Sequence, residues 1–255
     1  MLMEVKGLTK HFGGVAAVKE ISFQLKKSEI FALIGPNGAG KTTVFNLVTG
    51  MLEPDGGSMV FEGKSLFGLK PHQIAAAGIT RTFQNLQLFG GMTVLENIMA
   101  GAHLKGKTGF LKALTTWPGS AAEEKKIRRD AFALLGDVGL TGLENLPAST
   151  LSFGRQRLLE IARALASEPR LVLLDEPAAG LNSAETKEMA DYLKRLRKQG
   201  KSMVLVEHDM ETVMEVADRI IVLNFGEVIA VGTPAEIQAN PEVIKAYLGE
   251  DEQVA

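Results

Sequence analysis

Two kinds of strand pattern occur along the chain. Near the N-terminus, Met3 and Val5, and later Phe23 and Leu25, alternate with polar neighbours, which is typical of half-buried antiparallel strands. Four later runs are continuously apolar, as expected for a parallel sheet covered on both faces: residues 30–34, 171–174, 203–206 and 220–223. Helical patterns lie between them, so the sequence predicts an α/β core with an N-terminal antiparallel β lobe.

The stretch from about Leu86 to Arg157 interrupts this alternation and has a helical pattern. Capping-box sequences occur at residues 93–96 (Thr-Val-Leu-Glu) and 120–123 (Ser-Ala-Ala-Glu). After the second box, apolar residues fall on one helical face, and these are Ile127, Ala131, Leu134, Leu135 and Val138. We therefore predict a single domain over residues 1–255. Residues 1–85 and 158–255 would form the core with the β lobe, and residues 86–157 an inserted helical lobe.

The composition excludes several classes of protein. The 255 residues are 45% hydrophobic and 23% charged, as in a soluble globular domain. A net charge of −2 gives no indication of a nucleic-acid partner, and the absence of cysteine excludes disulfides and thiolate metal sites. The N-terminus lacks a signal-peptide pattern, and no apolar run approaches the ~18 residues of a membrane-spanning helix. We expect any role at a membrane to be exerted through a partner, from the cytoplasmic side.

A phosphate-binding loop is the most specific motif. Residues 35–42 match G-x-x-x-x-G-K-[ST] at every fixed position and follow an apolar strand. Glycines let backbone N–H groups converge on phosphate oxygens, and the helix that follows directs its positive end to the same place. Lys41 is predicted to reach the β- and γ-phosphates, and the Thr42 hydroxyl to bind Mg²⁺. The predicted ATP-binding residues here are Gly35, Pro36, Asn37, Gly38, Ala39, Gly40, Lys41, Thr42 and Thr43.

Two acidic residues follow the apolar run 171–174. The carboxyl ends of strands are where α/β sheets bind their ligands. Asp175 is suited to hold Mg²⁺ through water, and Glu176 to polarise the attacking water. Alone, the pair would fit a solvated loop after a core strand. Together with the phosphate loop, it predicts an ATPase that uses Mg²⁺.

Residues 151–157, Leu-Ser-Phe-Gly-Arg-Gln-Arg, resemble the signature L-S-G-G-Q of the ABC ATPases. Ser152 and Gly154 match, whereas Phe153 and Arg155 depart from the pattern. The resemblance implies an ABC ATPase fold with a composite site, in which Ser152 and Gly154 bind the ATP held by a partner subunit. A helix N-terminus that carries a serine hydroxyl suits a γ-phosphate.

The same resemblance gives roles to four single residues. Gln84 is similar to the family's Mg²⁺-sensing glutamine, and His208 to its γ-phosphate histidine, which adds His208 to Lys41 and Glu176 as predicted catalytic residues. Phe12 is similar to the aromatic residue that stacks on adenine, although a core position is an alternative. Asn182 stands where the family's D-loop commonly has aspartate.

Several further segments resemble the larger ATPase subunit of branched-chain amino-acid importers: residues 71–75, 81–85, 88–89, 92–97, the insert between Leu104 and Asp130, and the ending 246–249. The resemblance implies an ATP-hydrolysing motor that acts as an ATP-sandwich dimer at the cytoplasmic face of the membrane. The implied partners are a second ATPase subunit (identical or a paralogue), two integral-membrane permeases and, indirectly, an extracytoplasmic solute-binding protein. Importers for urea or short amides share much of this pattern.

Two other functions remain open. A soluble ABC ATPase could act as an ATP-gated switch without membrane partners, but such proteins usually carry two cassettes, coiled-coil insertions or basic surfaces. A switch that does not hydrolyse ATP is disfavoured by Lys41, Asp175, Glu176 and His208 together. For the transport motor, the apolar residues Leu86, Leu88, Phe89 and Met92 are expected to form the wall of a groove for a permease helix, with closure of the helical lobe's core as the alternative.

Overall fold

The computed structural model describes residues 1–102 and 120–248. It contains two compact units: unit 1 is Met1–Ile74 with Leu173–Ala255, and unit 2 is Ala75–Val172. The segment 86–157, predicted as an inserted lobe, falls within unit 2. Residues 103–119 of the insert, and Gly249 of the family-like ending, lie outside the described residues.

An antiparallel sheet forms the N-terminal part of unit 1. Its order is β2-β1-β4-β5, with β1 at Met3–Phe12, β2 at Val15–Leu25, β4 at Gly56–Phe61 and β5 at Lys64–Ser65. The alternating residues Met3, Val5, Phe23 and Leu25 are all buried. The predicted antiparallel strands are therefore confirmed, and their apolar positions face the core.

The second sheet of unit 1 carries the continuously apolar strands. Within unit 1 the strand order is β10-β9-β3-β8-β7, and the second segment of unit 1 begins within β7, at Leu173. The strands are β3 at Ile30–Ile34, β7 at Leu171–Asp175, β8 at Ser202–Val206, β9 at Arg219–Asn224 and β10 at Glu227–Gly232. The β3 strand pairs in parallel with both β8 and β9. Every residue of β3, β7 and β8 is buried, as the apolar runs predicted.

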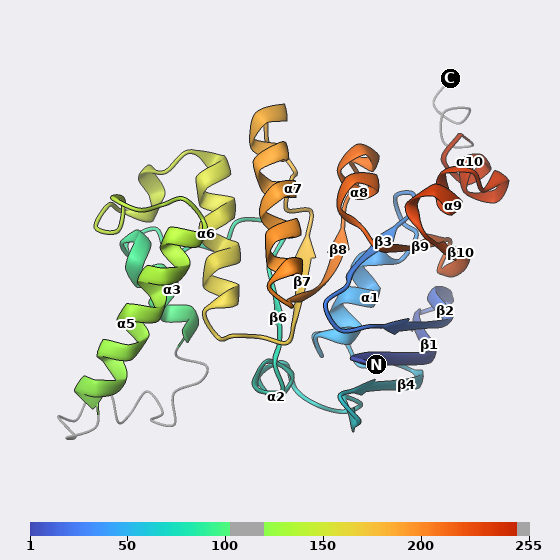
Figure 1. Ribbon diagram of the computed structural model, residues 1–255. Coiled ribbons are helices and arrows are strands. Elements are labelled where there is room, and N and C mark those ends of the chain that lie inside the picture. The colour runs from blue at the N-terminus through green and yellow to red at the C-terminus, as the bar shows by residue number, and fades with distance from the viewer. Residues whose placement is uncertain (103–119, 249–255) are drawn as a thin grey trace. The chain divides into compact units, whose positions relative to one another are not determined.

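Successive residues of β3 point to opposite faces of this sheet, and each face is covered (Figure 1). Ala32 and Ile34 belong to a cluster with α8, α9 and α10, to which these helices contribute Val213, Ile237 and Val243. Phe31 and Leu33 line a small apolar space with Val44, Phe45 and Val48 of α1. The helix bounds are Lys41–Val48 (α1), Met210–Val216 (α8), Pro234–Gln238 (α9) and Pro241–Leu248 (α10). Unit 1 is thus a layered α/β structure.

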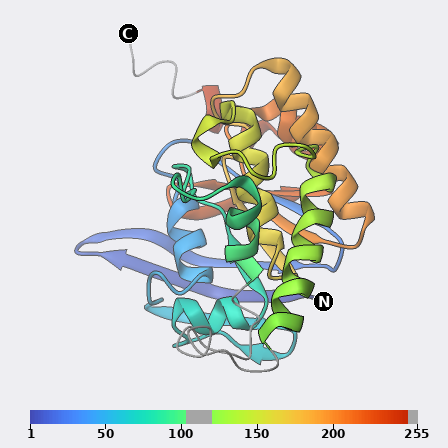
Figure 2. The ribbon, with the colours of Figure 1, turned by 90° about the vertical axis from the view of Figure 1, so that its left-hand side faces the viewer.

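Unit 2 is mainly helical in its described part. It contains β6 at Ile79–Arg81, α3 at Val94–Ala102, α5 at Ser120–Asp137 and α6 at Phe153–Leu165, while α2 (Pro71–Ala76) spans the boundary between the units. The α3, α5 and α6 helices pack together (Figure 2). The first predicted capping box is confirmed, because the Thr93 N–H donates to Glu96 Oε2 at 2.8 Å and the Glu96 N–H donates to Thr93 Oγ1 at 3.2 Å. The side chain of Ser120, in the second box, is outside the described residues.

Asn97 of α3 ties the preceding loop to its helix. Its side chain is completely buried. The Oδ1 atom accepts the Phe89 N–H at 2.9 Å, and Nδ2 donates to the Phe89 carbonyl at 3.1 Å and to the Thr93 carbonyl at 3.0 Å. A single buried amide therefore holds the backbone of the loop at both its donor and its acceptor groups.

Replacing Asn97 with alanine is expected to destabilise unit 2. The Phe89 N–H would lose its partner, which costs about 1–3 kcal/mol for an unsatisfied group, while the Phe89 carbonyl would keep the Met92 N–H at 2.9 Å. Thermal unfolding should shift to lower temperature, and hydrogen exchange at the Phe89 amide should accelerate. The control is Glu124→Ala on the exposed surface of α5, and equal stability of the two variants would contradict this role.

Candidate functional site

The phosphate loop lies between β3 and α1 with a backbone that requires glycine. Gly35 has φ 149° and Gly40 has φ 100°. A Cβ atom at Gly35 would lie 2.1 Å from the Leu223 carbonyl oxygen, and one at Gly40 would lie 2.5 Å from the Ala17 carbonyl oxygen. Both positions therefore exclude any side chain, for steric as well as conformational reasons.

Lys41, the first residue of α1, is held inside this loop. Its side chain is buried, with 7% of the residue exposed, and Nζ donates to the carbonyl oxygens of Gly35 at 2.5 Å and Pro36 at 2.8 Å. Thr42 is exposed and Thr43 is half-buried beside it. An ammonium group at the N-terminus of a helix, beside a loop of backbone N–H groups, favours a bound anion.

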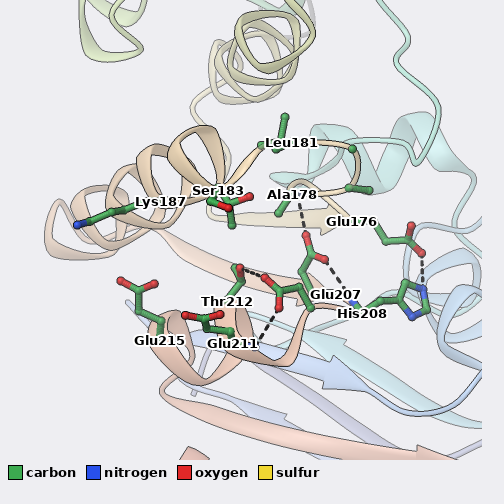
Figure 3. Close-up of a pocket in the computed structure, with 14 residues that line it drawn as sticks. Glu176, Ala178, Leu181, Ser183, Lys187, Glu207, His208, Glu211, Thr212 and Glu215 are labelled. Carbon is green, nitrogen blue, oxygen red and sulfur yellow. Dashed lines mark hydrogen bonds and ion pairs between the residues drawn. The ribbon is translucent and has the colours of Figure 1, made fainter.

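The ends of β7 and β8 contribute the acidic and histidine side chains. Asp175 is the last residue of β7 and is 4% exposed. Glu176 follows with φ 49°, a left-handed conformation that costs a residue with a side chain about 1–3 kcal/mol. Its N–H donates to the Val206 carbonyl at 2.9 Å, and its Oε1 lies 2.7 Å from Nε2 of His208. Two of the predicted catalytic residues are therefore in direct contact (Figure 3).

Glu207, between Val206 and His208, is buried with 3% exposed. Oε1 accepts the Ala178 N–H at 2.7 Å, and Oε2 accepts the His208 N–H at 3.2 Å. Burial is the main cause that raises the pKa of Glu207, the backbone N–H groups of Ala178 and His208 lower it, and the charge of Glu176 raises it further. The carboxylate is therefore costly to bury and is stabilised chiefly by backbone donors.

These groups border a cavity of about 680 Å³ between the starts of α7 (Ser183–Lys198) and α8. Its lining includes Glu176, Glu207, His208 and Lys187 (Figure 3). Asn182, the D-loop residue of the sequence analysis, is the N-cap of α7 and forms a capping box with Glu185. Its amide oxygen accepts the N–H groups of Ala184 and Glu185, each at 3.0 Å. Asparagine thus fills a local helix-capping role there.

The remaining predicted residues are distributed between the units. Phe12 ends β1 in unit 1, is 47% exposed and lies with its ring centroid 5.9 Å from Lys10 Nζ. Gln84 is exposed in unit 2, after β6, and its backbone carbonyl accepts Arg157 Nη2 at 2.7 Å. Ser152 is the N-cap of α6, and its side chain makes no capping hydrogen bond within the described part of the chain, while Gly154 is buried in the first turn.

Glu207 was not among the predicted site residues. The signal was present, because Glu207, His208 and Asp209 form a polar run directly after an apolar strand. A carboxylate in that position also fits a solvated loop, and only the adjacency of β7 and β8 shows that it is buried. The left-handed backbone of Glu176, in contrast, had no signal in the sequence.

The two side chains predicted to bind Mg²⁺ in this part of the site, Thr42 and Asp175, offer oxygen atoms as ligands. Among residues 1–102 and 120–248, no group of three or more His, Cys, Asp or Glu side chains could hold a metal ion alone. The Thr42 hydroxyl and the Asp175 carboxylate are hard ligands of the kind that Mg²⁺ takes together with phosphate oxygens and water. This donor set fits a cation that is delivered with a nucleotide. Within the same described residues, no helix is long and apolar enough to cross a membrane.

Comparison of the sequence with known protein families gives two matches. The family described as "ABC transporter" matches residues 18–179, and the family described as "Branched-chain amino acid ATP-binding cassette transporter" matches residues 227–253. The chain is 45% identical over 250 residues to the high-affinity branched-chain amino acid transport ATP-binding protein BraF of Pseudomonas aeruginosa. The alignment covers 98% of each chain.

Solved structures give the same result for the fold. The ADP conformation of MJ1267, an ATP-binding cassette of an ABC transporter, matches with a TM-score of 0.85 and 31% identity, covering 97% of this chain and 98% of that one. The dimeric post-hydrolysis state of the ATP-binding cassette MJ0796, bound to ADP and Pi, matches with a TM-score of 0.76 and 27% identity, covering 91% of this chain and 99% of that one. The fold class and the family resemblance predicted from the sequence are confirmed.

Gly40→Ala is expected to weaken ATP binding. The new methyl group would contact the Ala17 carbonyl at 2.5 Å, and backbone strain of about 1–3 kcal/mol corresponds to roughly 5- to 150-fold in affinity. Titration with a fluorescent ATP analogue measures the loss. Gly91→Ala is the control, because a Cβ atom there meets no atom of the described chain within 4 Å. Unchanged affinity in Gly40→Ala would remove this loop from the binding site.

Proposed function

This chain belongs to the ABC transporter family of ATP-binding proteins, and we propose that it is the ATP-hydrolysing subunit of an importer for branched-chain or other small amino acids. One observation carries the hydrolytic part of this proposal. Lys41, the first residue of α1, is bonded to the loop after β3, and Glu176 contacts His208 at 2.7 Å after β7 and β8 of the same sheet. The branched-chain part is supported by the name of BraF and by the family match at residues 227–253.

The loop of residues 35–43 binds the phosphates of ATP in this proposal. Backbone N–H groups of the loop and the ammonium of Lys41 contact phosphate oxygens. The carbonyl oxygens of Gly35 and Pro36 hold the Lys41 ammonium at the N-terminus of α1. Its positive charge is therefore in position before the nucleotide binds. Phe12, exposed at the end of β1, is available to stack on adenine.

Hydrolysis is assigned to Glu176 and His208. Glu176 orients a water molecule and accepts its proton as the water oxygen attacks the γ-phosphorus. The bond between the γ-phosphorus and the β–γ bridging oxygen breaks, which gives ADP and inorganic phosphate. The 2.7 Å contact with Nε2 orients the Glu176 carboxylate, and the His208 ring is half exposed, with 48% of its side chain accessible. The ring is therefore able to face a γ-phosphate.

Mg²⁺ is the cation that we propose for this site. Thr42 would bind the ion directly and Asp175 would bind it through water. Gln84 would act as the Mg²⁺-sensing glutamine. When bound, the ion neutralises charge on the β- and γ-phosphates. The support is the oxygen-only donor set at the start of α1 and the end of β7.

We assign the second half of each ATP site to a partner ATPase subunit, either a copy of this chain or a paralogue. Ser152 is exposed at the N-terminus of α6, a position where serine usually caps the helix, and its hydroxyl makes no capping bond within the described residues. That arrangement suits a phosphate contributed from outside. The dimeric MJ0796 cassette bound to ADP and Pi supports the same arrangement.

The other proposed partners are two membrane permeases, with a solute-binding protein outside the membrane, which places this chain at the cytoplasmic face. Phe89 is 51% exposed and Met92 is 39% exposed, while Leu86 and Leu88 are partly buried. The Arg163 guanidinium lies 5.3 Å from the Phe89 ring centroid. These exposed apolar side chains after Gln84 support the proposed groove for a permease helix.

A soluble switch without membrane partners is the competing function, and co-purification with permeases from solubilised membranes distinguishes the two.

Glu176→Gln should bind ATP normally and hydrolyse it at least about 100-fold more slowly, because an amide cannot accept the proton from water. Release of inorganic phosphate measures turnover, and titration with a fluorescent ATP analogue measures binding. The matched control is Glu185→Gln, a carboxylate nine residues along the chain that caps α7. Turnover of Glu176→Gln within threefold of wild type would assign the catalytic base to another residue.

Replacing Leu88 and Phe89 together with serine should uncouple transport from ATP hydrolysis. The isolated subunit should retain its ATPase activity, whereas the complex reconstituted with its permeases should lose solute uptake. Phe132→Ser is the matched control, because Phe132 is also an exposed phenylalanine (38%) beside an arginine, with the Arg128 guanidinium 5.6 Å from its ring. Full uptake by the double variant would place the permease contact elsewhere.

A further inference from the structure

The strained backbone of Glu176 is held from two sides by residues of one segment, 206–208. The Glu176 N–H donates to the Val206 carbonyl at 2.9 Å, and two residues later the Ala178 N–H donates to Glu207 Oε1 at 2.7 Å. Glu176 itself has φ 49°. Hydrogen bonds from the end of β8 therefore hold the backbone at Glu176, which has the left-handed conformation, and at Ala178, two residues later.

The same carboxylate also holds the backbone of His208. Glu207 Oε2 accepts the His208 N–H at 3.2 Å, and His208 Nε2 in turn lies 2.7 Å from Glu176 Oε1. The contacts form a closed circuit that runs from Glu176 through Ala178, Glu207 and His208 back to Glu176 (Figure 3). The position of each member is thus set by the others, with Glu207 at the centre.

We propose that Glu207 is a positioning residue for ATP hydrolysis, whose two carboxylate oxygens fix the backbones of Ala178 and His208 so that Glu176 and His208 meet in a reactive arrangement. This inference rests on the proposed function of Glu176 and His208. Glu207 does not touch ATP in this account. It acts through the two residues that do the chemistry.

A carboxylate suits this position better than other polar side chains. Each of its oxygens accepts one backbone N–H, and neither carries a hydrogen. Glutamine keeps the length but offers one acceptor, so its NH₂ group would face a backbone N–H. Aspartate keeps both acceptors but is one methylene shorter. Glu207 is 3% exposed and lies beside Glu176. Burying its carboxylate there costs free energy that a solvated loop residue would not cost.

The first test compares Glu207→Gln with wild type in the isolated full-length subunit. We expect kcat for ATP to fall on the order of tenfold, with KM and the dissociation constant for ATP within about twofold, since the phosphate loop is unchanged. Glu215→Gln is the control, because Glu215 pairs with Lys194 at 2.6 Å on the helix surface and should retain wild-type kcat. Wild-type kcat in Glu207→Gln would overturn the inference. So would a loss of ATP affinity or melting temperature that accounts for the loss of turnover.

A double-mutant cycle with His208→Ala separates positioning from general stability. If Glu207 acts through His208 and Glu176, then Glu207→Gln should reduce single-turnover hydrolysis much less in the His208→Ala background than in wild type. Full additivity would overturn the inference. Should Glu207→Gln fail to fold, Glu207→Asp replaces it, with the same outcomes expected. Unimpaired turnover in both His208→Ala and Glu176→Gln would instead refute the proposed function itself.

Discussion

The parallel pairing of β3 with β8 determines where the chemistry of this protein takes place. Leu33 and Val206 are partners in the register, so the phosphate loop and the segment 207–208 leave the sheet at the same edge. The hydrogen bond from the Glu176 N–H to the Val206 carbonyl brings the end of β7 to that edge as well. A slip of this register would separate the phosphate-binding loop from the hydrolytic pair.

Ionisable side chains are buried along this edge at a cost in stability. Lys41, Asp175 and Glu207 are all at most 7% exposed. Lys41 and Glu207 are hydrogen-bonded to backbone groups, which fixes their positions without a long flexible partner. Burial raises the pKa of Glu207, and Glu176 holds a strained backbone beside it. Natural proteins concentrate such costs at functional sites, which is consistent with the function assigned to this edge.

The sequence predicted the elements whose signal is local. The apolar runs at 30–34 and 203–206, the antiparallel strands, and the cap at Thr93 follow from residue order alone, and each is confirmed. The buried state of Glu207 and the left-handed backbone of Glu176 depend on contacts with a neighbouring strand, whereas Asn182 caps its own helix through local hydrogen bonds. The sequence alone does not show which strands are neighbours in the folded protein. The site roles of Gln84, Ser152 and Phe12 came from family resemblance and remain predictions.

The central claim is that the loop around Lys41 and the pair Glu176–His208 act on one ATP molecule. A crystal structure of the Glu176→Gln variant with ATP and Mg²⁺ tests it most directly. The account predicts a γ-phosphate within hydrogen-bond distance, about 3.5 Å or less, of both Lys41 Nζ and the His208 ring, with a water molecule between the phosphorus and residue 176. A γ-phosphate that contacts Lys41 but lies out of reach of both His208 and residue 176 would contradict it.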